Sequence, residues 1–221
     1  MADDVMVTAR EGAADIHFYE TDKPHGLKHN PFKSLVAPRP IGWITSLNEA
    51  GIVNLAPFSF FQAVADAPPM VIIAVNGTHK DKGAKDTLAN IRATQEFVCS
   101  IATWETREAM NTTSAHVDRG VDEMKLAGLA PAPSRLVKPP RVAAAPAALE
   151  CVLHQIVELP SSRKDSHNTT IFGRVVGVHI DRKILTDGKV DMEKFQPIAR
   201  LGYLDYAVVR ADAVFTMRRP D

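Results

Sequence analysis

Runs of apolar and alternating residues along the chain predict a fold built mainly from β-strands. A near-continuous apolar run at 70–75 indicates a strand buried on both faces. The turn Asn48–Gly51 separates two strands that pair as an antiparallel hairpin, and Asp187–Gly188 marks a later turn. The strands are expected at residues 16–19, 40–47, 52–64, 70–75, 96–102, 149–159, 169–180 and in the tail 198–209.

Helical segments are few and fall between these strands. A polar loop, residues 76–85, precedes a helix that we expect to run to Thr94 with Asp86 or Thr87 as its N-cap. Residues 103–128 have a helical pattern that a polar loop at 111–120 interrupts. Gly128 is expected to end this segment as a C-cap.

The order of these elements favours one domain, residues 1–221, built on a closed or nearly closed antiparallel barrel. Regular alternation of strands and helices, which predicts a doubly wound sheet, is absent. Gly173 and Gly177 in the strand 169–180 mark bends or a close approach of neighbouring chain. We interpret residues 1–30 as an N-terminal arm and the Pro- and Ala-rich residues 130–147 as a strap across the surface or onto a partner subunit.

Pro57 interrupts the strand 52–64. Proline has no N–H to donate to a ladder, so a bulge or a sheet edge is expected there. Bulges re-aim backbone groups beside binding sites, which makes residues 54–59 a candidate for ligand contact. A simple bend of the strand is the alternative interpretation.

The overall composition narrows the classes of function. Lys plus Arg and Asp plus Glu both total 26, so the balanced charge argues against a nucleic-acid binder. No apolar run is long enough to span a bilayer, and the acidic N-terminal stretch lacks a signal-peptide core, which together predict a cytoplasmic protein. Cys99 and Cys151 are expected to be buried free thiols, and the scattered histidines predict no metal site.

The known nucleotide and nucleophile motifs are absent: there is no G-x-G-x-x-G, no Walker A loop and no G-x-S-x-G. A phosphate cradle is conceivable where the helix after Lys85 begins, because helix N-termini expose free N–H groups and Thr87 carries a hydroxyl. Lys80 and Lys82 lie nearby. Composition alone favours the alternative, a solvated basic loop before an ordinary helix. Any chemistry is therefore expected to come from a cofactor, a ligand with a flat ring and an anionic end.

Several segments, taken in order, resemble the flavin reductase-like proteins with an FMN-binding split barrel. The branch with flavoredoxin and the reductase components of two-component monooxygenases is the most similar. The resemblance covers roughly residues 30–210. The segments that carry it are RPIGWITSLNEAGIVNLAPFSFF, PPMVIIAV, KDTLANI, FVCSIAT, EAMNTTSA, GVDEMKLAGLAPAPSR, PPRV and IARLGYLDYA.

This resemblance implies a mainly β fold with α insertions, an antiparallel Greek-key split β-barrel that binds FMN as a homodimer. The phosphate is then expected near Lys85, Asp86 and Thr87, with Asn90 behind them. The tail residues Arg200 and Tyr203 match a motif near the flavin. The ring and ribityl contacts implied are Thr45, Ser46, Asn54, Ala56, Pro57, Phe58 and Ser59.

The resemblance also implies a function, an FMN-dependent oxidoreductase that NAD(P)H reduces and that passes electrons to an acceptor such as a partner monooxygenase. No catalytic side chain is needed, and backbone N–H groups of a bulge at 54–59 would stabilise the reduced flavin. His167 matches a nicotinamide-contacting position, or else lies in a plain polar turn. The alternatives are a flavoredoxin-like electron carrier reduced by a protein donor, and a non-enzymatic FMN-binding module.

Overall fold

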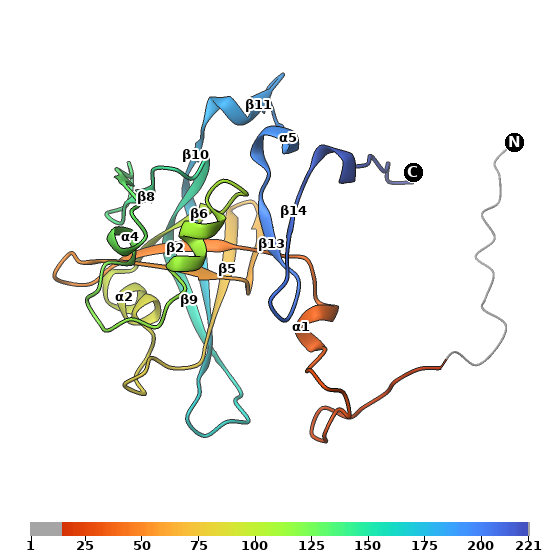
Figure 1. Cartoon of the computed structure of the whole chain (residues 1–221). Coiled ribbons are helices and arrows are strands. Elements are labelled where there is room, and N and C mark those ends of the chain that lie inside the picture. Colours follow the sequence, from red (N-terminus) through yellow and green to blue (C-terminus); the bar gives the residue numbers. More distant parts are fainter. Residues whose placement is uncertain (1–14, 221) are drawn as a thin grey trace, which may run out of the picture.

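The computed structural model describes residues 15–220 and shows a curled antiparallel sheet with a few short helices around it (Figure 1). Residues 1–14 lie outside the described residues. They include most of the acidic N-terminal stretch that argued against a signal peptide. The helices are α1 Phe32–Leu35, α2 Asp86–Thr94, α3 Arg107–Thr112, α4 Glu123–Leu126 and α5 Met192–Phe195, with 3-10 turns at Arg182–Ile184 and Ala211–Ala213.

Seven strands form the main sheet in the order β3-β2-β6-β9-β10-β5-β4, and every neighbouring pair is antiparallel. The chain passes from one edge strand to the other through Ser59 and Phe60 alone, so the two edges of the sheet lie close together. The expected mainly β barrel is confirmed. The strands of this sheet are β2 Gly42–Leu47, β3 Val53–Phe58, β4 Phe61–Asp66, β5 Pro69–Asn76, β6 Glu96–Ile101, β9 Ala147–Leu159 and β10 Asn168–Ile180.

Three small sheets complete the fold. One of them pairs β1, which precedes the barrel in the chain, with the tail strands, in the order β1-β13-β14. The turn at Asp187–Gly188 joins a two-stranded hairpin, as expected, with φ of 49° and 75°. The strands of these small sheets are β1 Arg39–Pro40, β7 Pro131–Ala132, β8 Arg141–Val142, β11 Leu185–Thr186, β12 Lys189–Val190, β13 Ile198–Arg200 and β14 Tyr206–Val208.

Side chains of β2 alternate between two apolar clusters, as the period of two in a strand requires. Ile44 packs in the barrel interior with Phe97 and Ile171, while Trp43 packs on the other face with Leu55 and the methionines of α3 and α4. The Trp43 Nε1–H donates to Thr113 Oγ1 at 2.8 Å. This second cluster therefore fixes the segment after α3 against the back of the sheet.

Several strand predictions need correction. Residues 52–64 form two strands, because the chain bends at Ser59 and Phe60, and residues 16–19 form no strand. Of the two alternatives expected at Pro57, the sheet edge is confirmed, whereas the register of β3 on β2 is unbroken and there is no bulge at 54–58. Strand β5 alternates between buried and half-buried residues instead of being buried on both faces, because only the face with Val71, Ile73 and Val75 packs in the barrel interior.

The two strand glycines behave as predicted. Register shifts in the pairing of β10 with β9 fall at Phe172/Gly173 and at Val175/Gly177. A Cβ on Gly173 would lie 2.2 Å from Cζ of Phe97, so only glycine lets that buried ring sit under the bend.

The helix boundaries differ from the expected ones in two places. Lys85, with extended backbone angles, is the N-cap of α2 in place of Asp86 or Thr87, and no side chain caps this end. Only α3 and α4 are helical within residues 103–128, because the polar residues between them hydrogen-bond in turns. Gly128 ends this segment with φ of 65°, as predicted.

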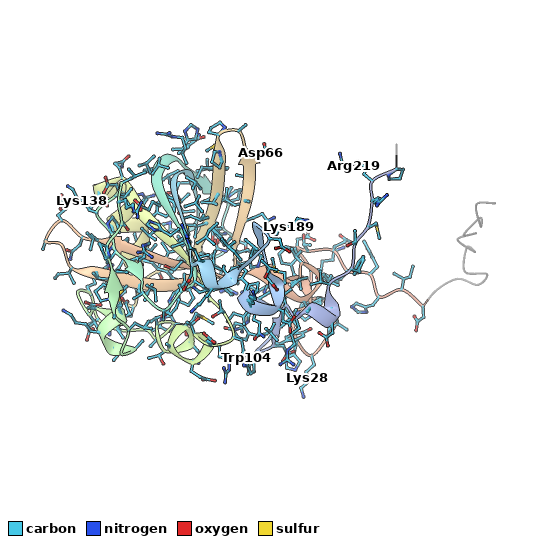
Figure 2. The ribbon with its side chains drawn as sticks, turned by 90° about the horizontal axis from the view of Figure 1, so that it is seen from above. Lys28, Asp66, Trp104, Lys138, Lys189 and Arg219 are labelled. Carbon is cyan, nitrogen blue, oxygen red and sulfur yellow. The ribbon has the colours of Figure 1, made fainter. Side chains whose placement is uncertain are left out.

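The strap, residues 130–147, packs on the barrel of its own chain. Buried Glu150 on β9 accepts backbone N–H groups from Arg135, Leu136 and Val137 at 2.8, 2.6 and 3.0 Å, and it also contacts His179. Burial raises the pKa of Glu150, but the hydrogen bonds of His179 and the three N–H groups outweigh it and lower the pKa to about 2. In Figure 2 the strap residue Lys138 lies at the opposite end of the molecule from Lys28 of the arm.

Within residues 15–220 no helix is long and apolar enough to cross a membrane, and no group of three or more His, Cys, Asp or Glu side chains is placed to hold a metal ion. Cys99 and Cys151 are buried free thiols, as predicted, and burial raises the pKa of Cys99 well above its usual value.

We expect Glu150→Gln to lower the free energy of unfolding by about 1–3 kcal/mol, because an ionised acceptor of several buried N–H groups is lost. The pKa of Glu150 is lower in the folded protein than in the unfolded chain. Its contribution is therefore complete above the unfolded pKa and disappears as the pH falls toward about 2. Urea unfolding at several pH values measures both effects.

The matched control is Glu158→Gln on the same strand, where the side chain is 55% exposed and pairs with Arg92. That change should cost less than about 1 kcal/mol, as exposed ion pairs do. Equal losses in the two variants would show that the buried carboxylate has no special role in holding the strap.

Candidate functional site

A cavity of about 310 Å³ lies along the outer edge of β3. The loop between β5 and α2 forms one wall, and the segment after α3 forms another. The residues around it are Lys33, Asn54, Ala56, Pro57, Phe58, Ser59, Phe60, Ala74, Asn76, Thr78, His79, Lys85, Asp86, Thr87, Thr113, Ser114, Ala115, His116, Val117 and Glu123.

The backbone of β3 takes part in the site because β3 is an edge strand. The Leu55 N–H points away from β2 and donates to Glu123 Oε2 at 2.9 Å. Pro57, two residues further along, faces the same way and has no N–H. The sheet edge beside the cavity is thus closed to further strand pairing, and it leaves carbonyl oxygens and small side chains toward the cavity.

A buried network of amides and hydroxyls supports one end of the cavity. Asn54 Nδ2 donates to Thr87 Oγ1 at 2.9 Å. Because Thr87 accepts this bond, its own hydroxyl proton is available to a ligand. Ser46 Oγ accepts from Asn54 at 3.4 Å and from Asn90 at 3.2 Å, so the first turn of α2 is joined to β2 and β3.

Arg119 holds the loop before α2 against the segment after α3. Its guanidinium makes a two-pronged pair with Asp81 at 2.6 and 2.9 Å, contacts Asp86, and donates to the Ala84 carbonyl at 2.9 Å. The hydrogen bond from Arg119 lowers the pKa of Asp81. The His79 ring bonds the Val117 carbonyl at 3.2 Å. These contacts fix two walls of the cavity relative to each other.

Two ionisable groups in the cavity are shifted toward their neutral forms. Burial, and secondly the charge of Lys33, lowers the pKa of Lys85. Burial raises the pKa of Glu123, and Asp86 and Asp122 add to that effect. Since Asp86 is paired with Arg119, the cavity presents ammonium groups that no carboxylate among residues 15–220 pairs with.

The structure brings most of the predicted cofactor-binding residues together. Ser46 and Asn90 lie behind the cavity wall in the amide network. Those that line the cavity are Asn54, Ala56, Pro57, Phe58, Ser59, Lys85, Asp86 and Thr87.

Four predicted residues lie elsewhere. Thr45 pairs with Leu55, so its side chain faces the second apolar cluster, where its buried Oγ1 has no hydrogen-bond partner. Arg200 stacks 4.4 Å from the Tyr206 ring centre and bonds the Tyr203 carbonyl, away from this cavity. His167 lines a depression on the other side of the loop before α2, where its carbonyl accepts the Gly77 N–H at 2.8 Å.

Sequence reasoning missed Lys33, Phe60, His79, His116 and Glu123. Glu123 stands within a segment that carries the family resemblance, so its motif was a usable signal. Lys33 lies in α1, far from the others in sequence, and nothing in the pattern of residues relates it to them.

The flavin reductase like domain matches residues 35–199 of this sequence. This chain belongs to the flavin reductase-like family. An uncharacterized protein of Aquifex aeolicus is 40% identical over 169 residues, which cover 76% of this chain and 83% of that protein.

Solved structures of the family agree with this assignment. Nitrilotriacetate monooxygenase component B from Bacillus cereus is 30% identical, with a TM-score of 0.78 over 88% of this chain and 96% of that one. The 2-nitrobenzoate 2-nitroreductase of Pseudomonas fluorescens is 29% identical, with a TM-score of 0.72 over 86% and 91%. Flavoredoxin of Desulfovibrio vulgaris, at 20% identity and TM-score 0.70 over 83% and 91%, shares the fold. Family membership supports a flavin-related redox role.

We expect Glu123→Gln to gain stability relative to the native chain as the pH rises. The pKa of Glu123 is higher in the folded protein than in the unfolded chain. The native chain therefore loses stability as the pH rises from the unfolded-state pKa to the folded-state pKa of this group. Glutamine keeps an acceptor for the Leu55 N–H but does not titrate. Urea unfolding at about pH 4 and about pH 8 compares the two chains on either side of the ordinary glutamate pKa.

Glu108→Gln on α3, where the side chain is 82% exposed, is the control and should show no such trend. A stability difference between Glu123→Gln and the native chain that stays constant over this range would contradict the burial argument.

Proposed function

We propose that this protein binds FMN in the cavity beside β3 and works as an NAD(P)H-dependent flavin reductase. The observation that carries the proposal is the polarity of the cavity. One end has the start of α2, Lys85 and the free hydroxyl proton of Thr87, and the wall along β3 has Pro57 and Phe58. A phosphate group fits the end at the start of α2, and a flat ring fits the wall along β3.

The residues present fit the cofactor. At the start of α2 no side chain caps the N–H groups, and these groups carry the positive end of the helix dipole. Lys85 adds an ammonium, whose charged form an anion would favour over the neutral form that burial promotes. The phosphate of FMN would be held by Lys85, Thr87 and the N–H groups of α2.

A bound flavin would supply hydride and electron-transfer chemistry at its ring. The chain itself would do three things. Pro57 and Phe58 would keep water from one side of the ligand, and Asn54, fixed by Ser46 and Thr87, would orient its polar groups. Glu123, which accepts the Leu55 N–H, would keep the edge of β3 closed behind the ligand.

The second candidate is an electron carrier that binds FMN and takes electrons from a protein donor. The position of His167 favours the electron carrier. In the single chain this side chain lies outside the cavity, so it is not placed to contact a nicotinamide bound there. The likeness to a monooxygenase component B supports a monooxygenase as the acceptor of the electrons.

We expect the purified protein to show a flavin absorption spectrum that bleaches when NADH or NADPH is added without oxygen. A flavin spectrum that bleaches only with a reduced protein donor would favour the electron-carrier function over the reductase function. A colourless protein that also takes up no added FMN would contradict the binding site itself.

We also propose that the protein works as a homodimer. Strand β4 is exposed on both faces in the single chain: five of its six residues, Gln62 to Asp66, are exposed and Val64 is 46% exposed. An uncovered edge strand with few charges invites pairing or packing with another chain. In Figure 2, Asp66 at the end of β4 stands on the opposite margin of the molecule from Trp104, so a partner on β4 would leave the Trp104 side open.

Val64→Asp should convert the dimer to monomers, because a buried unpaired carboxylate at an interface is costly. Sedimentation velocity over a range of concentrations measures this. Val190→Asp on the distant β12 hairpin, 38% exposed, is the control and should leave the dimer intact. A native chain that sediments as a monomer would contradict the dimer, and a dimeric Val64→Asp would contradict the role of β4.

A further inference from the structure

Lys33 reaches the cavity from outside the barrel. It belongs to α1, a single turn ahead of the barrel, yet its side chain lines the cavity together with Lys85. The ammonium lies 5.9 Å from the centre of the Phe60 ring, which forms the corner between β3 and β4. Lys33 and Lys85 thus share one cavity although they lie more than fifty residues apart in the chain.

The two ammonium groups repel each other. The charge of Lys33 is the second cause, after burial, of the lowered pKa of Lys85, and no carboxylate offsets it. Asp86 is engaged by Arg119, and Glu123 accepts the Leu55 N–H. Two neighbouring like charges without a counter-ion among residues 15–220 form an arrangement that a doubly charged anion would stabilise.

The position of Lys33 is fixed by the barrel and the tail. Buried Arg39 contacts the Lys33 carbonyl through Nη1 and donates from the same nitrogen to the carbonyls of Val36 and Leu201 at 2.6 and 3.0 Å. Arg39 itself is held in β1, opposite Arg200 of β13. The loop between β13 and β14 therefore lies beside α1 (Figure 1).

Gly202 makes this approach possible. A Cβ on Gly202 would lie 2.0 Å from Oγ of Ser34 and 2.9 Å from its Cα, so any larger residue would push α1 away from the tail. The neighbour of Ser34 in the chain is Lys33. The backbone from Lys33 to Val36 is thus set by contacts that do not involve the cavity, so the Lys33 side chain can serve a ligand.

We propose that Lys33 is a second phosphate-binding residue, which shares the phosphate group of FMN with Lys85 and is positioned by Arg39 and the tail loop. This inference rests on the proposed function, because it names a further binding residue of the same cavity. The ligand class is a flavin that carries a phosphate monoester; a flavin without one would leave both ammonium groups unsatisfied.

Comparison of FMN with riboflavin, which lacks the phosphate, tests the inference. Quenching of flavin fluorescence gives the affinity of each ligand for the native chain, Lys33→Ala, Lys85→Ala and the control Lys28→Ala, whose residue lies shortly before α1 but does not line the cavity. An ionic hydrogen bond of about 1.5–3 kcal/mol corresponds to a loss of FMN affinity of about 10- to 150-fold.

We expect Lys33→Ala and Lys85→Ala to lower the affinity for FMN by such a factor and to leave that for riboflavin within about twofold. Lys28→Ala should match the native chain for both ligands. Equal loss of FMN and riboflavin in Lys33→Ala, or no loss of either, would overturn the inference while Lys85→Ala still supports the FMN site. A native chain that binds neither flavin would refute the proposed function instead.

Discussion

The free edge of β3 is the constraint on which the site depends. An edge strand leaves every second N–H and C=O without a ladder partner, and these groups must be satisfied or removed. Here Glu123 accepts the Leu55 N–H, and Pro57 has none to offer. Because α4 brings Glu123 to this edge, the segment after α3 closes over β3 and a cavity forms where another strand would otherwise pair.

The charges around the cavity follow from the same closure. The segment that carries Glu123 also carries Arg119, and Arg119 engages both Asp81 and Asp86. The carboxylates nearest the start of α2 are therefore neutralised before any ligand arrives. Among residues 15–220 Lys85 has no carboxylate partner, and burial, with the charge of Lys33, lowers its pKa, so an anion beside Lys85 would stabilise the ammonium.

The pattern of apolar residues predicted the barrel, because alternation is a local property of the chain, whereas most of the candidate cavity residues were named only through the family resemblance. Alternation identified the strands, and the Pro57 argument correctly located an edge, although it could not choose between an edge and a bulge. The N-cap of α2 was misplaced by one residue, since a cap without a side-chain bond leaves no pattern. Lys33 was missed for another reason: its place in the cavity is set by Arg39 and Gly202, contacts between segments far apart in the chain.

The tail motif lies outside the cavity in the single chain, but the tail loop contacts the segment that carries Lys33. Arg200 and Tyr203 were expected beside the flavin, yet in the single chain Arg200 stacks on Tyr206 and bonds the Tyr203 carbonyl. The same tail loop accepts a hydrogen bond from Arg39 through the Leu201 carbonyl and admits Ser34 at Gly202. A change in this loop is expected to shift α1, and with it Lys33, because the loop and α1 are in direct contact.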